Sequence, residues 1–63
     1  MAAGTQFWPN DWSPLVEVVR RGKSYGTPGY FVRSPSAKPG QMAYGEMFIP
    51  DKYITKLRIK EQQ

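Results

Sequence analysis

The chain has 63 residues, with nine Lys and Arg against five Asp and Glu, so its formal net charge is +4. This length allows one domain, and a domain this small buries only about 60% of the surface that its unfolded chain exposes. The sequence has no Cys and no His, which excludes disulfides and the common zinc and iron sites as sources of stability. We therefore expect the fold to depend on nine aromatic side chains (two Trp, four Tyr and three Phe) or on association with another chain.

The composition also favours a cytoplasmic protein. No stretch approaches the roughly 18 consecutive apolar residues of a membrane span, so we expect no membrane association. The first residues have neither the basic region nor the apolar core of a signal peptide. The absence of Cys fits a reducing compartment. The positive charge favours anionic partners.

Residues 1–14 are predicted to form an irregular N-terminal arm. Two prolines five residues apart disfavour both a regular helix and a central strand. The arm carries Trp8 and Trp12, and an aromatic side chain of this kind buries about 150–250 Å² when it is covered. Two interpretations remain open. Either the arm folds over the open end of a small core, or one Trp anchors it in a pocket on a partner or a second copy.

Residues 15–60 are predicted to form the folded domain, and residues 61–63 a polar tail. The segment 15–21 is rich in β-branched residues, which is typical of a strand. Val19 breaks the strict alternation of this strand, so both of its faces are expected to be partly covered. Further strands are predicted at 30–33, 41–49 and 54–59, with glycine- and proline-rich loops at 22–29 and 34–40.

Pro50 is the strongest local signal in the chain. The apolar run 47–49 precedes it, and proline has no backbone N–H and a fixed φ, so a strand must end there. A single turn is expected over 51–53, before the last strand restarts at Ile54. Short strands at regular spacing without helical periodicity predict an all-β fold. We expect about five strands in a small barrel, because closure removes exposed sheet edges.

Two segments resemble SH3-like barrels. The pattern V-x-V-x-R-x-G over 16–22, with a glycine-rich loop and the short strand 29–32, is similar to the opening of many SH3-like and KOW-type modules. The segment 48–54 resembles the F-P-x-x-Y-V segment of SH3 domains, in which a strand ends at proline, a 3₁₀ turn follows and a last strand completes the barrel. The resemblance implies that Pro50 and Tyr53 line a groove for proline-rich ligands. SH3 domains read basic ligand residues with an acidic loop, whereas the corresponding loop here is basic.

Catalysis is not expected. His and Cys, the usual acid–base and nucleophilic groups near neutral pH, are absent. The five carboxylates are scattered, and no glycine-rich segment opens a helix as phosphate-binding signatures do. We therefore predict a non-enzymatic protein with no catalytic residues, no metal and no cofactor.

Basic residues interleaved with tyrosine make nucleic-acid binding, in an accessory or regulatory factor, the leading functional hypothesis. Lys and Arg neutralise phosphates, and an aromatic side chain stacks on an unpaired base for about 1–3 kcal/mol. The last predicted strand places three cations on one face, where they repel each other unless an anion is present. The alternative is a solvated face that protects an edge strand from aggregation. The candidate contacts to DNA or RNA are Arg20, Arg21, Lys23, Tyr25, Arg33, Lys56, Arg58 and Lys60.

The competing hypothesis is a protein-interaction module or a small subunit of a larger assembly. The chain has more large apolar side chains than a small barrel easily covers, which also favours self-association. Met42 and Met47 are expected in the core. Dispersed cations and an apolar patch at a Trp would favour this second hypothesis over the first. Its candidate docking residues are Trp8, Trp12, Pro50 and Tyr53.

Overall fold

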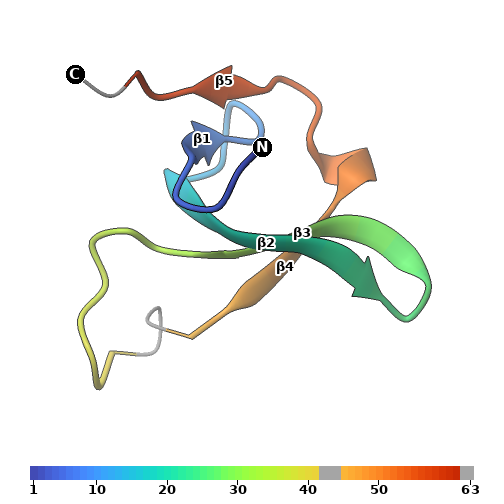
Figure 1. The fold of residues 1–63 in the computed structure, drawn as a ribbon. Coiled ribbons are helices and arrows are strands. Elements are labelled where there is room, and N and C mark those ends of the chain that lie inside the picture. The colour runs from blue at the N-terminus through green and yellow to red at the C-terminus, as the bar shows by residue number, and fades with distance from the viewer. Residues whose placement is uncertain (42–44, 62–63) are drawn as a thin grey trace.

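The computed structural model describes residues 1–41 and 45–61, and it contains five antiparallel strands in one sheet. The sheet order is β4-β3-β2-β1-β5 (Figure 1). The predicted all-β fold is thus confirmed, and the described residues contain no α-helix. The elements are β1 (Gln6–Trp8), β2 (Val16–Ser24), β3 (Thr27–Arg33), β4 (Met47–Pro50), the 3₁₀ helix η2 (Asp51–Tyr53) and β5 (Arg58–Ile59).

The sheet is not closed into a barrel, so this part of the prediction was wrong. The two edge strands, β4 and β5, are not paired with each other in the described part of the chain. Both are short, and between them the chain turns through η2 and an irregular link instead of running beside β4. Two strands of this length offer too few backbone groups to join the opposite edges of the sheet.

Part of the predicted irregular arm is a sheet strand. Residues 6–8 form β1, which lies between β2 and β5, with Phe7 opposite Val16 on one side and Ile59 on the other. Pairing continues just before the strand, because the Gly4 amide donates to the Val18 carbonyl at 2.9 Å. Proline disfavours a strand only where its missing N–H would have to donate to a neighbouring strand, and β1 ends before the first proline of the arm.

The predicted loop at 22–29 is mostly strand. β2 and β3 form a long hairpin whose turn consists of two residues, Tyr25 and Gly26, with φ of 50° and 79°. Positive φ at both positions is characteristic of a tight hairpin turn. Pro28 is accommodated because it lies beyond the end of β4, whose pairing with β3 begins at Gly29.

The break in alternation at Val19 lies at a shift in register, and Val19 itself is partly buried, as expected for a strand with both faces partly covered. The pairing of β2 with β3 shifts between Val18 and Arg20, as in a β-bulge. Before the shift, Val16 and Val18 point into the core. After it, Arg20 lies opposite Phe31 and Arg21 lies opposite Tyr30.

The prediction at Pro50 is confirmed, whereas the flanking strands are shorter than expected. β4 ends at Pro50, which is also the N-cap of η2. The predicted strand 54–59 is reduced to 58–59, and the predicted strand 41–49 to 47–50. Residues 42–44 of that prediction, including Met42, and residues 62–63 of the predicted tail lie outside the described residues. Met47 is not a core residue, because 45% of it is exposed.

The core lies between β1, β2 and β3. It consists of the fully buried side chains of Phe7, Val16, Val18 and Val32. Four partly buried residues pack against this cluster: Met1, Tyr30, Ile49 and Ile54. A core this small leaves large side chains elsewhere on the surface, and the positions of those side chains bear on function.

Candidate interaction surface

The arm is fastened to the segment that precedes β5. The Pro9 carbonyl accepts hydrogen bonds from the amides of Thr55 at 3.0 Å and Lys56 at 3.2 Å. The Asn10 side-chain amide donates to the Tyr53 carbonyl at 3.3 Å. These bonds replace strand pairing over residues 55–56, which is why the last predicted strand begins late.

The same fastening presents Trp12 to solvent. The Oδ1 atom of Asn10 accepts a hydrogen bond from the Trp12 amide at 2.9 Å, which closes a turn. Asp11, inside this turn, forms an ion pair with Lys56 at 3.0 Å. The Trp12 side chain is 88% exposed. The backbone at Trp12 is therefore held on its N-terminal side, while the residue itself lies almost entirely in water.

A second exposed aromatic residue lies on η2. Pro50 begins this turn and Tyr53 ends it, with 57% of Tyr53 exposed. The Nζ atom of Lys52 is 5.5 Å from the centre of the Tyr53 ring. Because Asn10 bonds to both the Trp12 amide and the Tyr53 carbonyl, the backbones of these two exposed aromatic residues lie close together.

Trp8 and Arg58 extend this region along the β1–β5 pair. They lie opposite each other in the sheet, and the Arg58 guanidinium is 5.1 Å from the centre of the Trp8 ring. Trp8 is half-buried, and the Arg58 guanidinium covers part of its ring through a cation–π contact. We call the set Trp8, Trp12, Lys52, Tyr53 and Arg58 the arm surface.

Four of the cations predicted to contact nucleic acid are engaged by carboxylates of the chain. Arg20 pairs with Glu46 at 3.0 Å and stacks on the Phe31 ring, 4.1 Å from its centre. Arg33 pairs with Glu17 at 3.1 Å. The other two are Arg21, paired with Asp51, and Lys56, paired with Asp11.

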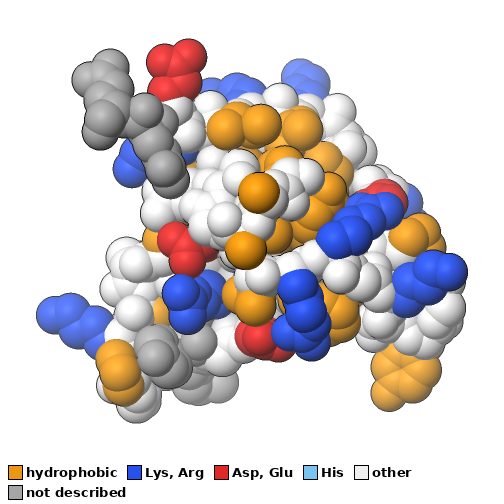
Figure 2. Space-filling view, viewed as in Figure 1, with side chains coloured by type: hydrophobic (Ala, Val, Ile, Leu, Met, Phe, Trp, Pro, Cys, Tyr) orange, Lys and Arg blue, Asp and Glu red, His pale blue; other side chains and the backbone are white. Residues whose placement is uncertain are grey.

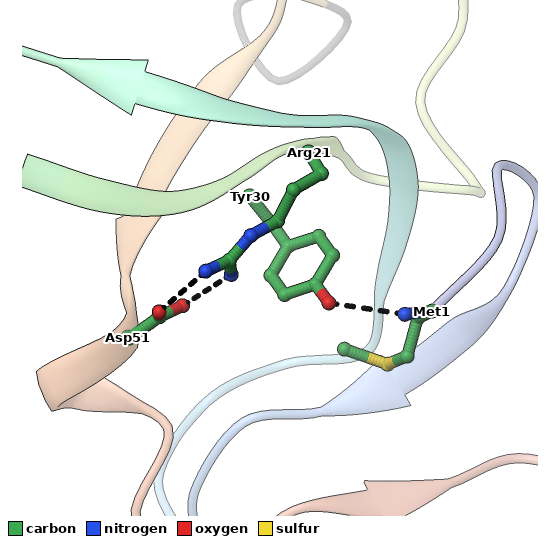
Figure 3. Close-up of polar contacts among 4 residues, drawn as sticks. All are labelled: Met1, Arg21, Tyr30 and Asp51. Carbon is green, nitrogen blue, oxygen red and sulfur yellow. Dashed lines mark hydrogen bonds and ion pairs between the residues drawn. The ribbon is translucent and has the colours of Figure 1, made fainter.

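The Arg21 pair belongs to a polar cluster beside η2 (Figure 3). Its two Nη atoms donate to the two carboxylate oxygens of Asp51 at 2.6 and 2.7 Å, and these bonds lower the pKa of Asp51. The guanidinium is 4.7 Å from the centre of the Tyr30 ring, and the Tyr30 hydroxyl accepts a hydrogen bond from the Met1 amine at 3.0 Å. Together with Ile54 and Leu57, these four residues line an open cavity of about 410 Å³.

Three more of the residues predicted to contact nucleic acid lie at separate places on the molecule. Lys23 and the fully exposed Tyr25 are at the β2–β3 turn, whereas Lys60 follows β5 next to β1. Neither lysine has a carboxylate partner among the described residues. Figure 2 shows cationic side chains spread around one face of the molecule instead of gathered in a basic stripe.

Sequence reasoning missed Lys52 and the contact of Asn10 with Tyr53, whereas a turn at Asn10-Asp11 was expected. The turn at Asn10 has a local signal, since an Asn side chain commonly accepts a hydrogen bond from the amide two residues later. Its bond to Tyr53, a residue 43 positions away, has no such signal. Lys52 lies beside the Tyr53 ring because both residues belong to the 3₁₀ turn.

The described residues provide no group of three or more His, Cys, Asp or Glu side chains that could hold a metal ion. Within the same residues, no helix is long and apolar enough to cross a membrane. Comparisons with protein-family models, with curated proteins and with solved structures found no match to the chain.

Proposed function

We propose that this protein is a non-enzymatic interaction module that docks onto a protein partner through the arm surface. The observation that carries the proposal is the combination found at Trp12. Its ring is 88% exposed, yet the turn that holds it is fixed by the side chain of Asn10 and the ion pair of Asp11. Because the backbone at Trp12 is already held in a turn, binding requires less ordering of the backbone, and the ring brings a large apolar area.

The neighbourhood of Trp12 supports the same proposal. Tyr53 is exposed on a turn that begins at a proline, and Trp8, on β1, is partly exposed. Trp, Tyr and Arg are the residue types most enriched among side chains that dominate binding energy at interfaces. The arm surface contains all three.

The SH3-like resemblance gives secondary support. A strand that ends at Pro50, a 3₁₀ turn over 51–53 and a short last strand reproduce the succession expected for the segment 48–54. Because the sheet is open, the resemblance concerns this succession of elements and the placement of Pro50 and Tyr53, and it does not extend to a closed barrel.

The test compares two exposed aromatic residues at different places. Immobilised wild-type protein, Trp12→Ala and Tyr25→Ala are each incubated with a lysate of the native cells, and the retained proteins are quantified. We expect the wild type and Tyr25→Ala to retain the same partner and Trp12→Ala to lose it, with a binding penalty of about 2 kcal/mol or more. Retention of the same proteins by Trp12→Ala would reject the proposal.

Nucleic-acid binding is the second candidate, and the turn of the β2–β3 hairpin is the feature that favours it. Tyr25 is fully exposed there and Lys23 has no carboxylate partner among the described residues, so a base could stack while a phosphate is neutralised. The same two variants separate the candidates. Binding of a labelled single-stranded oligonucleotide that weakens with salt and is lost in Tyr25→Ala, but not in Trp12→Ala, would favour this function.

A further inference from the structure

We infer that the segment recognised by the arm surface is an acidic peptide of the partner protein, with a carboxylate beside Tyr53 and Trp8. The inference rests on the proposed function and adds the chemistry of the ligand. It follows from the charges that remain once the ion pairs within the chain are taken into account.

The acidic side chains near the arm surface are already neutralised. Asp11, in the Trp12 turn, pairs with Lys56 at 3.0 Å. Asp51, the first residue of η2, binds both Nη atoms of Arg21. Neither carboxylate is free to select a basic residue in a ligand without losing its own partner.

The cations on the arm surface have no such compensation. Lys52 and Arg58 form no ion pair with any described carboxylate, and both are exposed. Each lies close to an aromatic ring of the surface, Lys52 to Tyr53 and Arg58 to Trp8. An apolar or proline-containing segment that contacts these rings therefore meets a positive charge beside each ring.

This charge pattern is the reverse of the one in the resembled domains, where an acidic loop reads basic ligand residues. A peptide is favoured over a nucleic acid because four of the predicted cations are paired with carboxylates of the chain, and the cationic side chains on the face in Figure 2 are spread instead of forming a stripe along which a phosphate backbone could lie. A carboxylate of a peptide needs only the charged end of Lys52 or Arg58.

The experiment selects ligands without knowing the partner. Random 12-residue peptides displayed on phage are selected on the wild-type protein after depletion on Trp12→Ala. We expect the enriched peptides to carry more Asp and Glu than Lys and Arg. For the strongest synthetic peptide, Lys52→Glu should weaken binding about tenfold. Lys38→Glu makes the same change of charge at an exposed lysine of the 34–40 loop, and it should weaken binding less than about twofold.

Each outcome has a separate meaning. If no peptide distinguishes the wild type from Trp12→Ala, the proposed function fails and the inference fails with it. If such peptides are enriched but are neutral or basic, the proposed function stands and the inference is overturned. If Lys52→Glu and Lys38→Glu weaken binding equally, the recognition is unspecific attraction, which also overturns it. Displacement of the peptide by an equal concentration of a single-stranded oligonucleotide would assign the surface to nucleic acid instead.

Discussion

Two glycines in the long hairpin show how single residues shape the outer face of the sheet. Gly22 and Gly29 lie opposite each other in β2 and β3, and the rings of Phe31 and Phe48 lie over them. The two rings contact each other with their centres 5.0 Å apart. The glycines therefore leave room for an aromatic pair. This pair packs on the face of the sheet opposite to the one that holds the core.

The two glycines differ in how much space surrounds them. A Cβ atom added at Gly29 would collide with the backbone carbonyl of Ile49 and lie 2.7 Å from the Phe48 ring. At Gly22 it would meet the edge of the Phe31 ring at 2.9 Å, and this ring can tilt away. We expect Gly29→Ala to lower the free energy of unfolding by about 1–3 kcal/mol, the usual cost of overpacking.

Urea unfolding of both variants provides the measurement, with Gly22→Ala as the matched control because it adds the same methyl group. A smaller loss is expected for Gly22→Ala. Equal losses in the two variants would show that backbone entropy or strand propensity, and not the close approach of β4, determines the need for glycine at 29.

At the scale of the elements, polar side chains tie β1, β2 and β3 together. Gln6 on β1 donates a hydrogen bond to Glu17 on β2 at 3.2 Å, and Arg33 on β3 pairs with the same carboxylate. These hydrogen bonds, that from Gln6 first, lower the pKa of Glu17 below its ordinary value of 4.5. The ionised carboxylate is thus favoured in the folded state.

This shift predicts the direction in which stability depends on pH. A carboxyl group with a lowered pKa in the folded state stabilises the fold above its unfolded value, and the contribution is lost as pH falls through the folded value. The free energy of unfolding should therefore decrease below about pH 4.5. In Glu17→Gln this decrease should be smaller, by an amount within the roughly 0.2–1 kcal/mol of an exposed ion pair.

The measurement is urea unfolding at several acidic pH values, with Glu61→Gln as the control. Glu61 is an exposed carboxylate without an ion pair among the described residues. An identical pH dependence in wild type and Glu17→Gln would mean that the contacts of Glu17 with Gln6 and Arg33 contribute nothing to folding stability.

Elements whose cause is local were predictable from the sequence, and those that depend on distant pairing were not. Proline alone ends β4 and starts the turn at 51–53, so Pro50 could be placed correctly. β1 forms because Phe7 fits between Val16 and Ile59, which no nearby residue indicates. Pro28 was predicted in a loop because proline cannot donate a hydrogen bond to a neighbouring strand. It is tolerated in β3 because β4 does not extend as far as Pro28, and the sequence alone does not show which strand lies beside β3.

The same distinction applies to the candidate surface. The aromatic residues of the arm and of the turn could be singled out by type. The pairing of the cations could not, because every carboxylate partner of Arg20, Arg21, Arg33 and Lys56 is at least 16 residues away. Of the three cations predicted on one face of the last strand, Lys56 is paired with Asp11, whereas Arg58 and Lys60 have no carboxylate partner among the described residues.

For the whole molecule, the arm has two roles that lie five residues apart. Phe7 is fully buried and joins β1 to the core, whereas Trp12 is 88% exposed and contributes to no buried cluster. Phe7 is held by backbone pairing in the sheet, whereas the Trp12 amide is held by the side chain of Asn10. The arm is therefore part of the fold up to the turn at Asn10, and it offers a binding group beyond it.

Thermal unfolding of Phe7→Ala and Trp12→Ala, followed by circular dichroism, tests this division most directly. Loss of the buried Phe7 ring should cost about 3–5 kcal/mol, enough to unfold much of a domain whose total stability is about 5 kcal/mol. Trp12→Ala should keep its melting temperature within about 4 °C of the wild type, because exposed substitutions change stability by less than about 0.5 kcal/mol. A fall in melting temperature for Trp12→Ala as large as that for Phe7→Ala would contradict the division, because Trp12 would then be part of the fold and not a group available to a partner.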